Sequence, residues 1–268
     1  MIIDAHAHIG SFGNKEYTPE ELVSSMKEAG IDYSLVIAQP FDSSGKNLGG
    51  MEYILKATQK YSQLKPIGFV DINRLDSAYI EELKNLLLER KIYGLKFYLG
   101  YMEFYPNDER LHSLYSFCEK KGFPVIFHTG VLAIGVRGFL KYSHPLGVDD
   151  VAVLFPGLKI VIAHFGNPWV MDAAAVTAKN KNVYVDLSGY FTEYASISKK
   201  EQQEFLQDLE RFHSFVGDFK KCLFGSDWWL YDQKEYLKAV ESLPFTKDKE
   251  ERDLVLWKNA CEVFGLDV

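Results

Sequence analysis

Short apolar runs alternate with helix-like segments along the whole chain, and this alternation limits the available folds more than any other feature. The runs read MIIDAHAH, DYSLVIAQP, KPIGFVDIN, YGLKFYLG, PVIFHTG, KIVIAHFG, VYVDLSG and KCLFGSDWW. Several of them, such as Ile160 to Ala163, are apolar at successive positions. Continuous apolar runs of this length are typical of strands that are buried on both faces of a parallel sheet.

The segments that follow these runs have helical patterns with start and stop signals. Residues 18–21, Thr-Pro-Glu-Glu, form a capping box with proline at the first helical position, and Gly30 stands where a C-terminal glycine belongs. Similar patterns cover Asp76 to Arg90, Leu111 to Cys118 before Gly122, and a segment starting at Asp232 that repeats the capping-box arrangement with Glu235. The sequence therefore predicts a helix after each strand.

Alternation of strands and helices implies an α/β fold with a parallel sheet, which is either doubly wound or closed. Eight units in 268 residues favour a closed (β/α)8 TIM-type barrel. A Rossmann sheet is the alternative, but no GxGxxG motif follows the first strand. No linker rich in Pro, Gly or Ser interrupts the chain, so we expect residues 1–268 to form a single domain. Residues 247–265 predict an additional C-terminal helix that packs across the outside or bottom of the barrel.

The composition of the chain limits the classes of molecule that the protein is expected to bind. The net charge of −7 argues against a general affinity for nucleic acid or anionic membranes. The three cysteines are dispersed and form neither a disulfide framework nor a CxxC metal site. Because neither a signal peptide nor a membrane-length apolar run is visible, we expect a cytoplasmic domain with a small-molecule substrate. The sequence leaves open whether the chain forms a homo-oligomer.

Polar side chains interrupt the apolar strands, mostly where the strands end. They are His6, His8, Lys96, His128, His164, Asp186 and Asp227. His6 and His8 are two residues apart, so in a strand they point to the same face. Burying such groups costs several kcal/mol each unless a partner compensates them, and a divalent cation would pair with many at once. For any one residue a satisfied core position is the alternative, but the set indicates a metal site, because imidazole and carboxylate are normal Zn²⁺ ligands.

Taken in order along the chain, these motifs resemble the amidohydrolase superfamily. The segments are IIDAHAHIG, GLKFY, PVIFHTG, FPGLKIVIAHFGNPW, VYVDLSG, LFGSDW and KNACEVFGL, and they extend over essentially the whole sequence. The closest resemblance is to the amidohydrolase-related branch, which includes aminocarboxymuconate-semialdehyde decarboxylase. It implies a (β/α)8 barrel with one divalent metal, most simply zinc, at its mouth. The residues carried over as metal ligands are His6, His8, His128 and Asp227.

The resemblance also implies catalytic roles for Asp227 and His164. The free oxygen of Asp227 would accept a proton from the metal's water, and His164 would bind that water or polarise the substrate carbonyl. Orienting the site is the alternative role for His164. In binuclear members of the superfamily a lysine at the position of Lys96 is carbamylated and bridges a second metal, which His128 and His164 also bind. We favour one metal, with Lys96 free to bind a substrate carboxylate.

Further residues are candidates for substrate binding or support. Tyr98 and Trp228 are placed to line a pocket, and residues 131–145 are a lid candidate that contains Arg137, a potential anion binder. A solvated loop arginine is the alternative for Arg137. Asp186 either supports a histidine ligand or forms hydrogen bonds within the barrel core, and we favour the second interpretation.

The leading hypothesis is a metal-dependent hydrolase of the amidohydrolase type. It would use a metal-activated water on a small carbonyl-containing substrate such as an amide, lactone or ester. The alternative is a metal-dependent nonoxidative decarboxylase, which is a carbon–carbon lyase. Its substrate would be a small carboxylated compound, and aromatic acids belong to this class. Both reactions use the same ligands, so the site residues do not separate them. A barrel whose metal serves binding alone is disfavoured, because the set contains more than binding needs.

Overall fold

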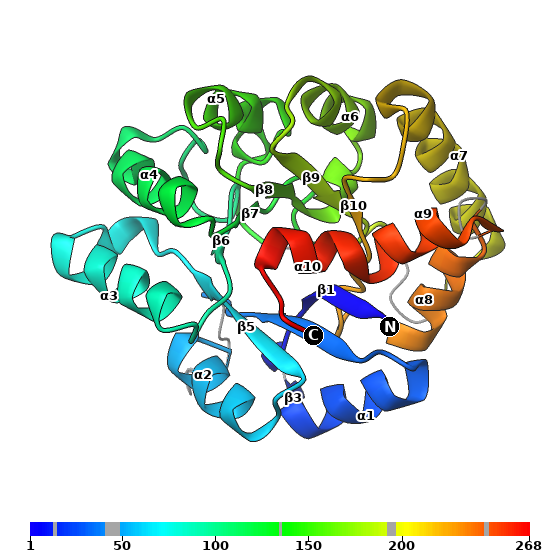
Figure 1. Ribbon diagram of the computed structural model, residues 1–268, viewed down its shortest axis with the longest axis horizontal. Coiled ribbons are helices and arrows are strands. Elements are labelled where there is room, and N and C mark those ends of the chain that lie inside the picture. The colour runs from blue at the N-terminus through cyan, green and yellow to red at the C-terminus, as the bar shows by residue number, and fades with distance from the viewer. Residues whose placement is uncertain (13–14, 41–48, 134–135, 192–196, 244–246) are drawn as a thin grey trace.

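Eight parallel strands form the centre of the computed structural model and follow one another around it in chain order (Figure 1). The structure describes residues 1–12, 15–40, 49–133, 136–191, 197–243 and 247–268. The strands are β1 (Ile3–Ala7), β4 (Tyr33–Ile37), β5 (Leu64–Phe69), β6 (Leu95–Phe97), β7 (Val125–Phe127), β8 (Ile160–Ile162), β9 (Val183–Asp186) and β10 (Cys222–Leu223). Nearly all of their residues are buried, as the continuous apolar runs predict.

Backbone hydrogen bonds between β1 and the segment after β10 close the sheet. The amide of Ala5 donates to the carbonyl of Phe224 over 2.8 Å, and the amide of Asp227 donates to the carbonyl of His6 over 2.8 Å. The amide of His8 donates to the carbonyl of Trp228 over 2.5 Å. The predicted (β/α)8 barrel is therefore confirmed, and its closure brings the HxH motif against the GSD motif.

A ring of helices covers the outside of the barrel, with one following each strand of the barrel (Figure 1). They are α1 (Pro19–Ala29), α2 (Met51–Lys60), α3 (Ser77–Leu88), α4 (His112–Lys121), α5 (Leu146–Leu154), α6 (Val170–Lys179), α7 (Lys199–Val216) and α8 (Gln233–Glu241). Short 3-10 turns span Ile72–Arg74, Glu109–Leu111, Leu140–Tyr142 and Ala163–Gly166. The capping box at Thr18 and Glu21 is present. Asp232 forms half of the predicted second box, accepting a hydrogen bond from the amide of Glu235.

The C-terminal segment closes the bottom of the barrel. It consists of α9 (Lys249–Asp253), a π-helical turn (Leu254–Lys258) and α10 (Asn259–Phe264). Apolar side chains of α10 pack against inward-facing residues of the strands, including Ile3 and Leu35. Figure 1 shows this segment lying across the end of the barrel. Of the two predicted positions, outside or bottom, the structure shows the bottom, and the π-helical turn is a feature that the sequence pattern did not indicate.

A two-stranded hairpin beside the mouth was not predicted. It pairs β2 (Gly10–Phe12) with β3 (Lys15–Tyr17) in antiparallel register. Tyr17 stacks on Trp229 with ring centroids 5.0 Å apart, which holds the hairpin against the segment after β10. Strands of three residues are too short to produce a recognisable alternation, so they could not be predicted from the sequence.

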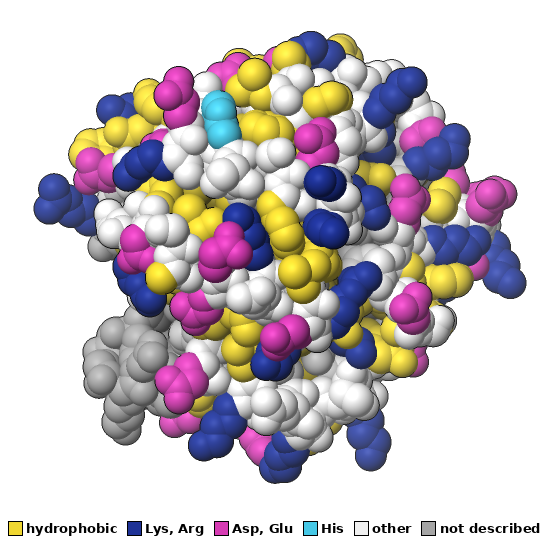
Figure 2. All heavy atoms as spheres, turned by 60° about the vertical axis from the view of Figure 1, so that its left-hand side comes forward, with side chains coloured by type: hydrophobic (Ala, Val, Ile, Leu, Met, Phe, Trp, Pro, Cys, Tyr) yellow, Lys and Arg dark blue, Asp and Glu magenta, His cyan; other side chains and the backbone are white. Residues whose placement is uncertain are grey.

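The outer surface is of mixed charge on the side of α3 and α4. Figure 2 shows lysine and arginine side chains interspersed there with aspartate and glutamate, and no large patch of one sign on that face. In the described parts of the chain, no helix combines the length and the apolar character that crossing a membrane requires.

Candidate metal centre

Two histidines of the first strand face a carboxylate that follows the last strand. His6 lies within β1 and His8 follows it directly, while Asp227 comes after β10. The Nε2 atoms of His6 and His8 lie 3.7 and 3.3 Å from Oδ1 of Asp227. One ligand atom from each of the three residues lies within 4.8 Å of the others. Two imidazole nitrogens and a carboxylate oxygen at this spacing fit a divalent transition metal such as zinc.

The opposite nitrogens of the two rings are fixed by acceptors. Nδ1 of His6 is 3.0 Å from Oδ2 of Asp186, and Nδ1 of His8 is 3.1 Å from the carbonyl oxygen of Ile37. Because a carboxylate and a carbonyl oxygen accept hydrogen bonds, both rings carry their proton on Nδ1. Each Nε2 then presents a lone pair toward Asp227. Outer partners of this kind orient histidine ligands in metal sites.

Asp186 is thus the partner of a candidate ligand, which is the interpretation that the sequence did not favour. Burial alone would raise the pKa of Asp186, but its contact with His6, which donates a hydrogen bond to it, holds that pKa well below its usual range. The residue stays ionised and can anchor the His6 ring. Its Oδ1 also accepts a hydrogen bond from the amide of His164 over 3.0 Å, so one carboxylate organises both histidines.

Asp227 occupies a strained backbone position. Its φ is +60°, in the left-handed region that residues other than glycine rarely adopt. Behind it, the fully buried carboxylate of Asp4 accepts hydrogen bonds from the amides of His6 and Ser226 at 3.1 and 2.9 Å. It also accepts from Oγ of Ser226 and Nε2 of Gln233 at 2.6 and 2.7 Å. Burial raises the pKa of Asp4 to about 6. This network ties β1 to the turn that carries Asp227.

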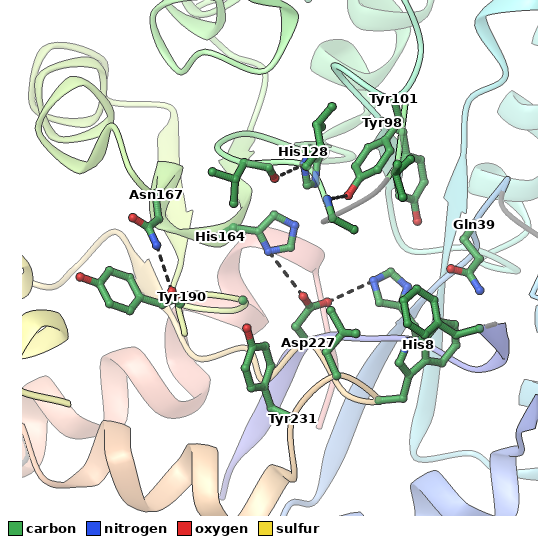
Figure 3. Close-up of a pocket in the computed structure, with 18 of the residues that line it drawn as sticks. His8, Gln39, Tyr98, Tyr101, His128, His164, Asn167, Tyr190, Asp227 and Tyr231 are labelled. Atoms are coloured by element: carbon green, nitrogen blue, oxygen red, sulfur yellow. Dashed lines mark hydrogen bonds and ion pairs between the residues drawn. The ribbon is translucent and has the colours of Figure 1, made fainter. Parts of the chain in front are cut away.

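The electrostatics of the centre favour an ionised Asp227 and neutral rings at His6 and His164. Burial alone would raise the pKa of Asp227, but its contacts with His8, His164 and His6 hold that pKa far below its usual range. Burial lowers the pKa of His164 to about 3. Figure 3 shows the rings of His8 and His164 on opposite sides of the Asp227 carboxylate.

His164 lies at the end of β8, also with a positive φ, of +59°. Its Nδ1 is 3.1 Å from Oγ of Ser188 and 3.8 Å from Oδ2 of Asp227. The hydroxyl of Ser188 donates its proton to Asp186 and therefore accepts one from Nδ1 of His164. The neutral ring consequently keeps a lone pair on Nε2. Sequence reasoning missed Ser188, which lies in the turn directly after β9, beyond the strand whose period could have placed it.

The structure does not bring His128 into the group formed by His6, His8 and Asp227. The His128 ring lies beside His164, with centroids 4.7 Å apart, and its Nε2 donates to the carbonyl of Val131 over 3.1 Å. Burial lowers the pKa of His128 well below its usual value. Its free nitrogen is therefore Nδ1, and its role as a ligand stays a prediction.

Lys96 points into the barrel rather than toward solvent. Its side chain is fully buried on β6, and its Nζ is 3.3 Å from Nε2 of His6. Burial lowers the pKa of Lys96 to about 8. The amine therefore belongs to the same cluster as the candidate ligands.

A cavity of about 300 Å³ opens above this cluster. Its lining consists of His8, Phe12, Gln39, Lys96, Tyr98, Tyr101, His128, Val131, Leu132, Ala133, Val136, His164, Asn167, Gly189, Tyr190, Phe191, Asp227, Trp229, Leu230 and Tyr231 (Figure 3). Tyr98 lines the cavity as expected and donates its hydroxyl to the carbonyl of Ala38 over 2.9 Å.

Two predicted binding residues lie outside this lining. The cavity is lined by Trp229 instead of Trp228, whose ring packs edge-on against Tyr17. Arg137 is exposed and does not line the cavity, although Val131 and Val136 from the same lid candidate do. Two residues of that segment, 134 and 135, lie outside the described residues. The choice between adjacent tryptophans depends on the backbone after β10, which no sequence period fixes.

Comparison with known proteins places these observations in a family. A family model described as amidohydrolase matches residues 3–266. A search of curated proteins found no match. The structure is similar to a probable 2-pyrone-4,6-dicarboxylic acid hydrolase from Acinetobacter baumannii, crystallised with citric acid, with 20% identity, 99% coverage of both chains and a TM-score of 0.74.

Two further solved structures share the fold. One is an amidohydrolase from Burkholderia multivorans with bound zinc, at 16% identity, 99% coverage of both chains and a TM-score of 0.75. The other is 5-carboxyvanillate decarboxylase from Sphingomonas paucimobilis, at 13% identity, 99% coverage of both chains and a TM-score of 0.70. At these identities the likeness extends to the fold alone. The match of the family model to almost the whole sequence shows that the chain belongs to the amidohydrolase family, in its amidohydrolase-related branch.

Proposed function

We propose that the protein is a metal-dependent hydrolase that acts on a carbonyl carbon of a small substrate. The observation that carries this proposal is the convergence of His6, His8 and Asp227, of which the last two line the cavity, with both rings oriented by outer partners. We propose one divalent metal at this position, held by these three residues and by His128, with zinc as the natural choice for the donor set. The zinc-bound relative from Burkholderia multivorans supports that choice.

A bound metal of this kind would lower the pKa of water and polarise a carbonyl group. The protein's own residues supply the proton transfers. Asp227 directs Oδ1 toward His8, whereas its Oδ2 is 3.8 Å from Nδ1 of His164, beyond hydrogen-bond distance, so Oδ2 can accept a proton of an attacking water. We propose that His164 accepts a proton through Nε2, because Nδ1 is occupied by Ser188 and the ring is neutral.

Lys96 would serve as the cation for a negatively charged group on the substrate. Its buried amine faces the candidate ligands and lines the cavity. An ammonium in such a position pairs with a carboxylate as a point charge. We therefore propose a free Lys96 amine rather than a carbamate that bridges a second metal.

One observation favours nonoxidative decarboxylation as a second candidate. A cation beside the reacting centre would hold a substrate carboxylate where it could be lost as CO2, and 5-carboxyvanillate decarboxylase shares the fold. In that reaction the C–C bond to the carboxylate breaks, its electron pair stays on the substrate carbon and a proton replaces CO2 there.

The deciding experiment assays the metal-loaded protein against lactones, esters, amides and carboxylated aromatics, with CO2 and hydrolysis products measured separately. Hydrolysis without CO2 supports the first proposal and CO2 release supports the second.

The metal site is tested with two matched variants: His8→Ala, which removes a candidate ligand, and His112→Ala, which changes a half-buried histidine of α4. Metal content by plasma mass spectrometry should fall in the first variant and stay constant in the second. Full metal occupancy in His8→Ala would contradict the proposed site.

A further inference from the structure

We propose that the substrate has one polar, reacting end and an opposite end that is apolar and uncharged, as in a substituted aromatic or aliphatic monoacid or its acyl derivative. The inference rests on the proposed function for which end reacts, but its own observation is the uneven chemistry of the cavity wall. Acids with a second charged group at the far end, and phosphorylated compounds, are excluded by the same wall.

Charge is confined to the floor of the cavity. The floor contains His8, Lys96, His128, His164 and Asp227, which lie on strands or just after them. Among the lining residues that the structure describes, Lys96 is the one lysine or arginine. A carboxylate, carbonyl or leaving group can therefore be recognised at the floor.

The wall above the floor is apolar and aromatic. Its larger apolar members are Phe12, Val131, Leu132, Val136, Phe191, Trp229 and Leu230. They come from the hairpin beside the mouth and from the segments after β7, β9 and β10, so they surround the cavity on several sides. An apolar body of the substrate would gain free energy by leaving water here.

The tyrosine hydroxyls of the wall already have partners, whereas Nε2 of Gln39, which also lines the cavity, has none among the described residues. This neutral amide is a hydrogen-bond donor but not a cation. The hydroxyl of Tyr101 accepts from the amide of Ala133 over 2.8 Å, and that of Tyr190 donates to Asp208 over 2.8 Å. The hydroxyl of Tyr231 donates to the carbonyl of Phe191. A second carboxylate would thus enter an apolar region without a cation to pair with it, which is costly.

The first test compares two ligand pairs that differ at the far end. Binding of 4-ethylbenzoate and terephthalate, and of hexanoate and adipate, is measured by titration calorimetry on the metal-loaded protein. In each pair we expect the monoacid to bind about tenfold tighter or more, because the diacid places an unpaired charge against the apolar wall. Equal or tighter binding of the diacids, or binding of none of the four, would overturn the inference.

The second test moves a cation into the wall. Val136 lines the cavity but is 45% exposed, so a longer side chain fits there without repacking the core. Val136→Lys should weaken the preference for the monoacid severalfold, whereas the neutral Val136→Met should retain it. Circular dichroism and metal content establish that both variants are folded. An unchanged preference in Val136→Lys would show that the wall does not contact the far end.

Binding measurements separate this inference from the proposed function. A clear preference for monoacids without any hydrolysis or CO2 release would leave the inference standing and reject the proposed function. Conversely, turnover of a dicarboxylate with a higher kcat/KM than its monoacid partner would reject the inference and leave the function standing.

Discussion

His164 is the residue on which the chemistry depends most closely. Ser188 fixes the proton of its neutral ring on Nδ1, which makes Nε2 an acceptor that faces the cavity. The amide of an asparagine side chain can still donate to Ser188 but has no basic nitrogen in place of Nε2. His164→Asn is therefore the variant that separates proton transfer from positioning.

We expect His164→Asn to retain its metal and to lower kcat by about 10²- to 10⁴-fold with a small change in KM. His112→Asn in α4 is the control and should resemble the wild type. A fall in metal content from two ions to about one would instead support a carbamylated Lys96 and a second metal. Unchanged metal together with unchanged kcat would reject both roles for His164.

Gly189 limits the position of His164. Its φ is +61°, and a β-carbon at this residue would lie 2.5 Å from Nδ1 of His164 and 2.9 Å from Oδ2 of Asp227. Gly30, at the end of α1, has a similar φ of +74° but nothing within 4 Å of the same atom. The two glycines therefore share the backbone strain of an alanine substitution and differ in the steric clash.

Gly189→Ala should lose at least tenfold in kcat, while Gly30→Ala should keep its activity and lose about 1 kcal/mol of stability. Activity assays and urea unfolding of both variants provide the comparison. Equal kcat values in the two variants would mean that the site tolerates movement of His164 and that Gly189 does not restrict the position of this ring.

The sequence predicted which residues form the site better than it predicted the hydrogen-bond partners of those residues. The convergence of His6, His8 and Asp227 follows from strand ends and a two-residue period, both of which are visible in the sequence. The hydrogen bond that His6 donates to Asp186 joins β1 to β9, which are not neighbours in the sheet, and no local sequence pattern encodes such a pairing. His128 lies outside this group, and its Nε2 donates to the carbonyl of Val131, a loop contact that no sequence period encodes.

Helices and strands could be predicted from the sequence where they are long or have capping residues. The capping box at Thr18 and the left-handed Gly122 mark their helices as the sequence indicates. The hairpin of β2 and β3 was missed because its contacts are aromatic packing against Trp229, a residue far away in sequence. Tertiary contacts of this kind decide short elements, while periodicity decides long ones.

The C-terminal segment is attached to the barrel by a buried amide. Nδ2 of Asn259 donates to the carbonyls of Phe219 and Cys222 at 3.0 and 2.7 Å, and the residue is 1% exposed. Asn182 makes the matching pair of bonds to Phe155 and Leu158 at 3.0 and 2.8 Å but is half-buried. Water can replace the lost donor at the second position but not at the first.

Asn259→Ala should therefore lower the free energy of unfolding by about 2–4 kcal/mol, because two buried carbonyls lose their partner. Asn182→Ala should cost about 1 kcal/mol. Urea denaturation of both variants measures the difference, and metal content should stay that of the wild type in each. Similar losses for the two variants would show that burial of the amide is not what makes the attachment strong.

The two ends of the barrel divide stability from function. The bottom is an apolar cluster closed by α10, whereas the mouth gathers the buried charges of Lys96, Asp186 and Asp227. Positive φ angles at His164 and Asp227 add strain at the mouth. Strained and charged buried residues persist only where the surrounding structure holds them in place. Such residues are concentrated at functional positions. A metal at the mouth should accordingly stabilise the whole molecule.

Adding zinc to chelator-treated protein should raise its Tm by about 5–10 °C, since ligand at 100-fold excess over Kd contributes about 2.7 kcal/mol. Asp227→Ala removes a candidate ligand and should abolish most of this rise, as measured by scanning calorimetry with and without zinc. Asp218→Ala removes a surface carboxylate that pairs with Lys220 at 2.9 Å, and it should show the same rise as the wild type. If both variants gained equally, zinc would be stabilising the protein from elsewhere on its surface. A rise confined to the wild type and Asp218→Ala would connect the strained turn at the mouth to the stability of the entire barrel.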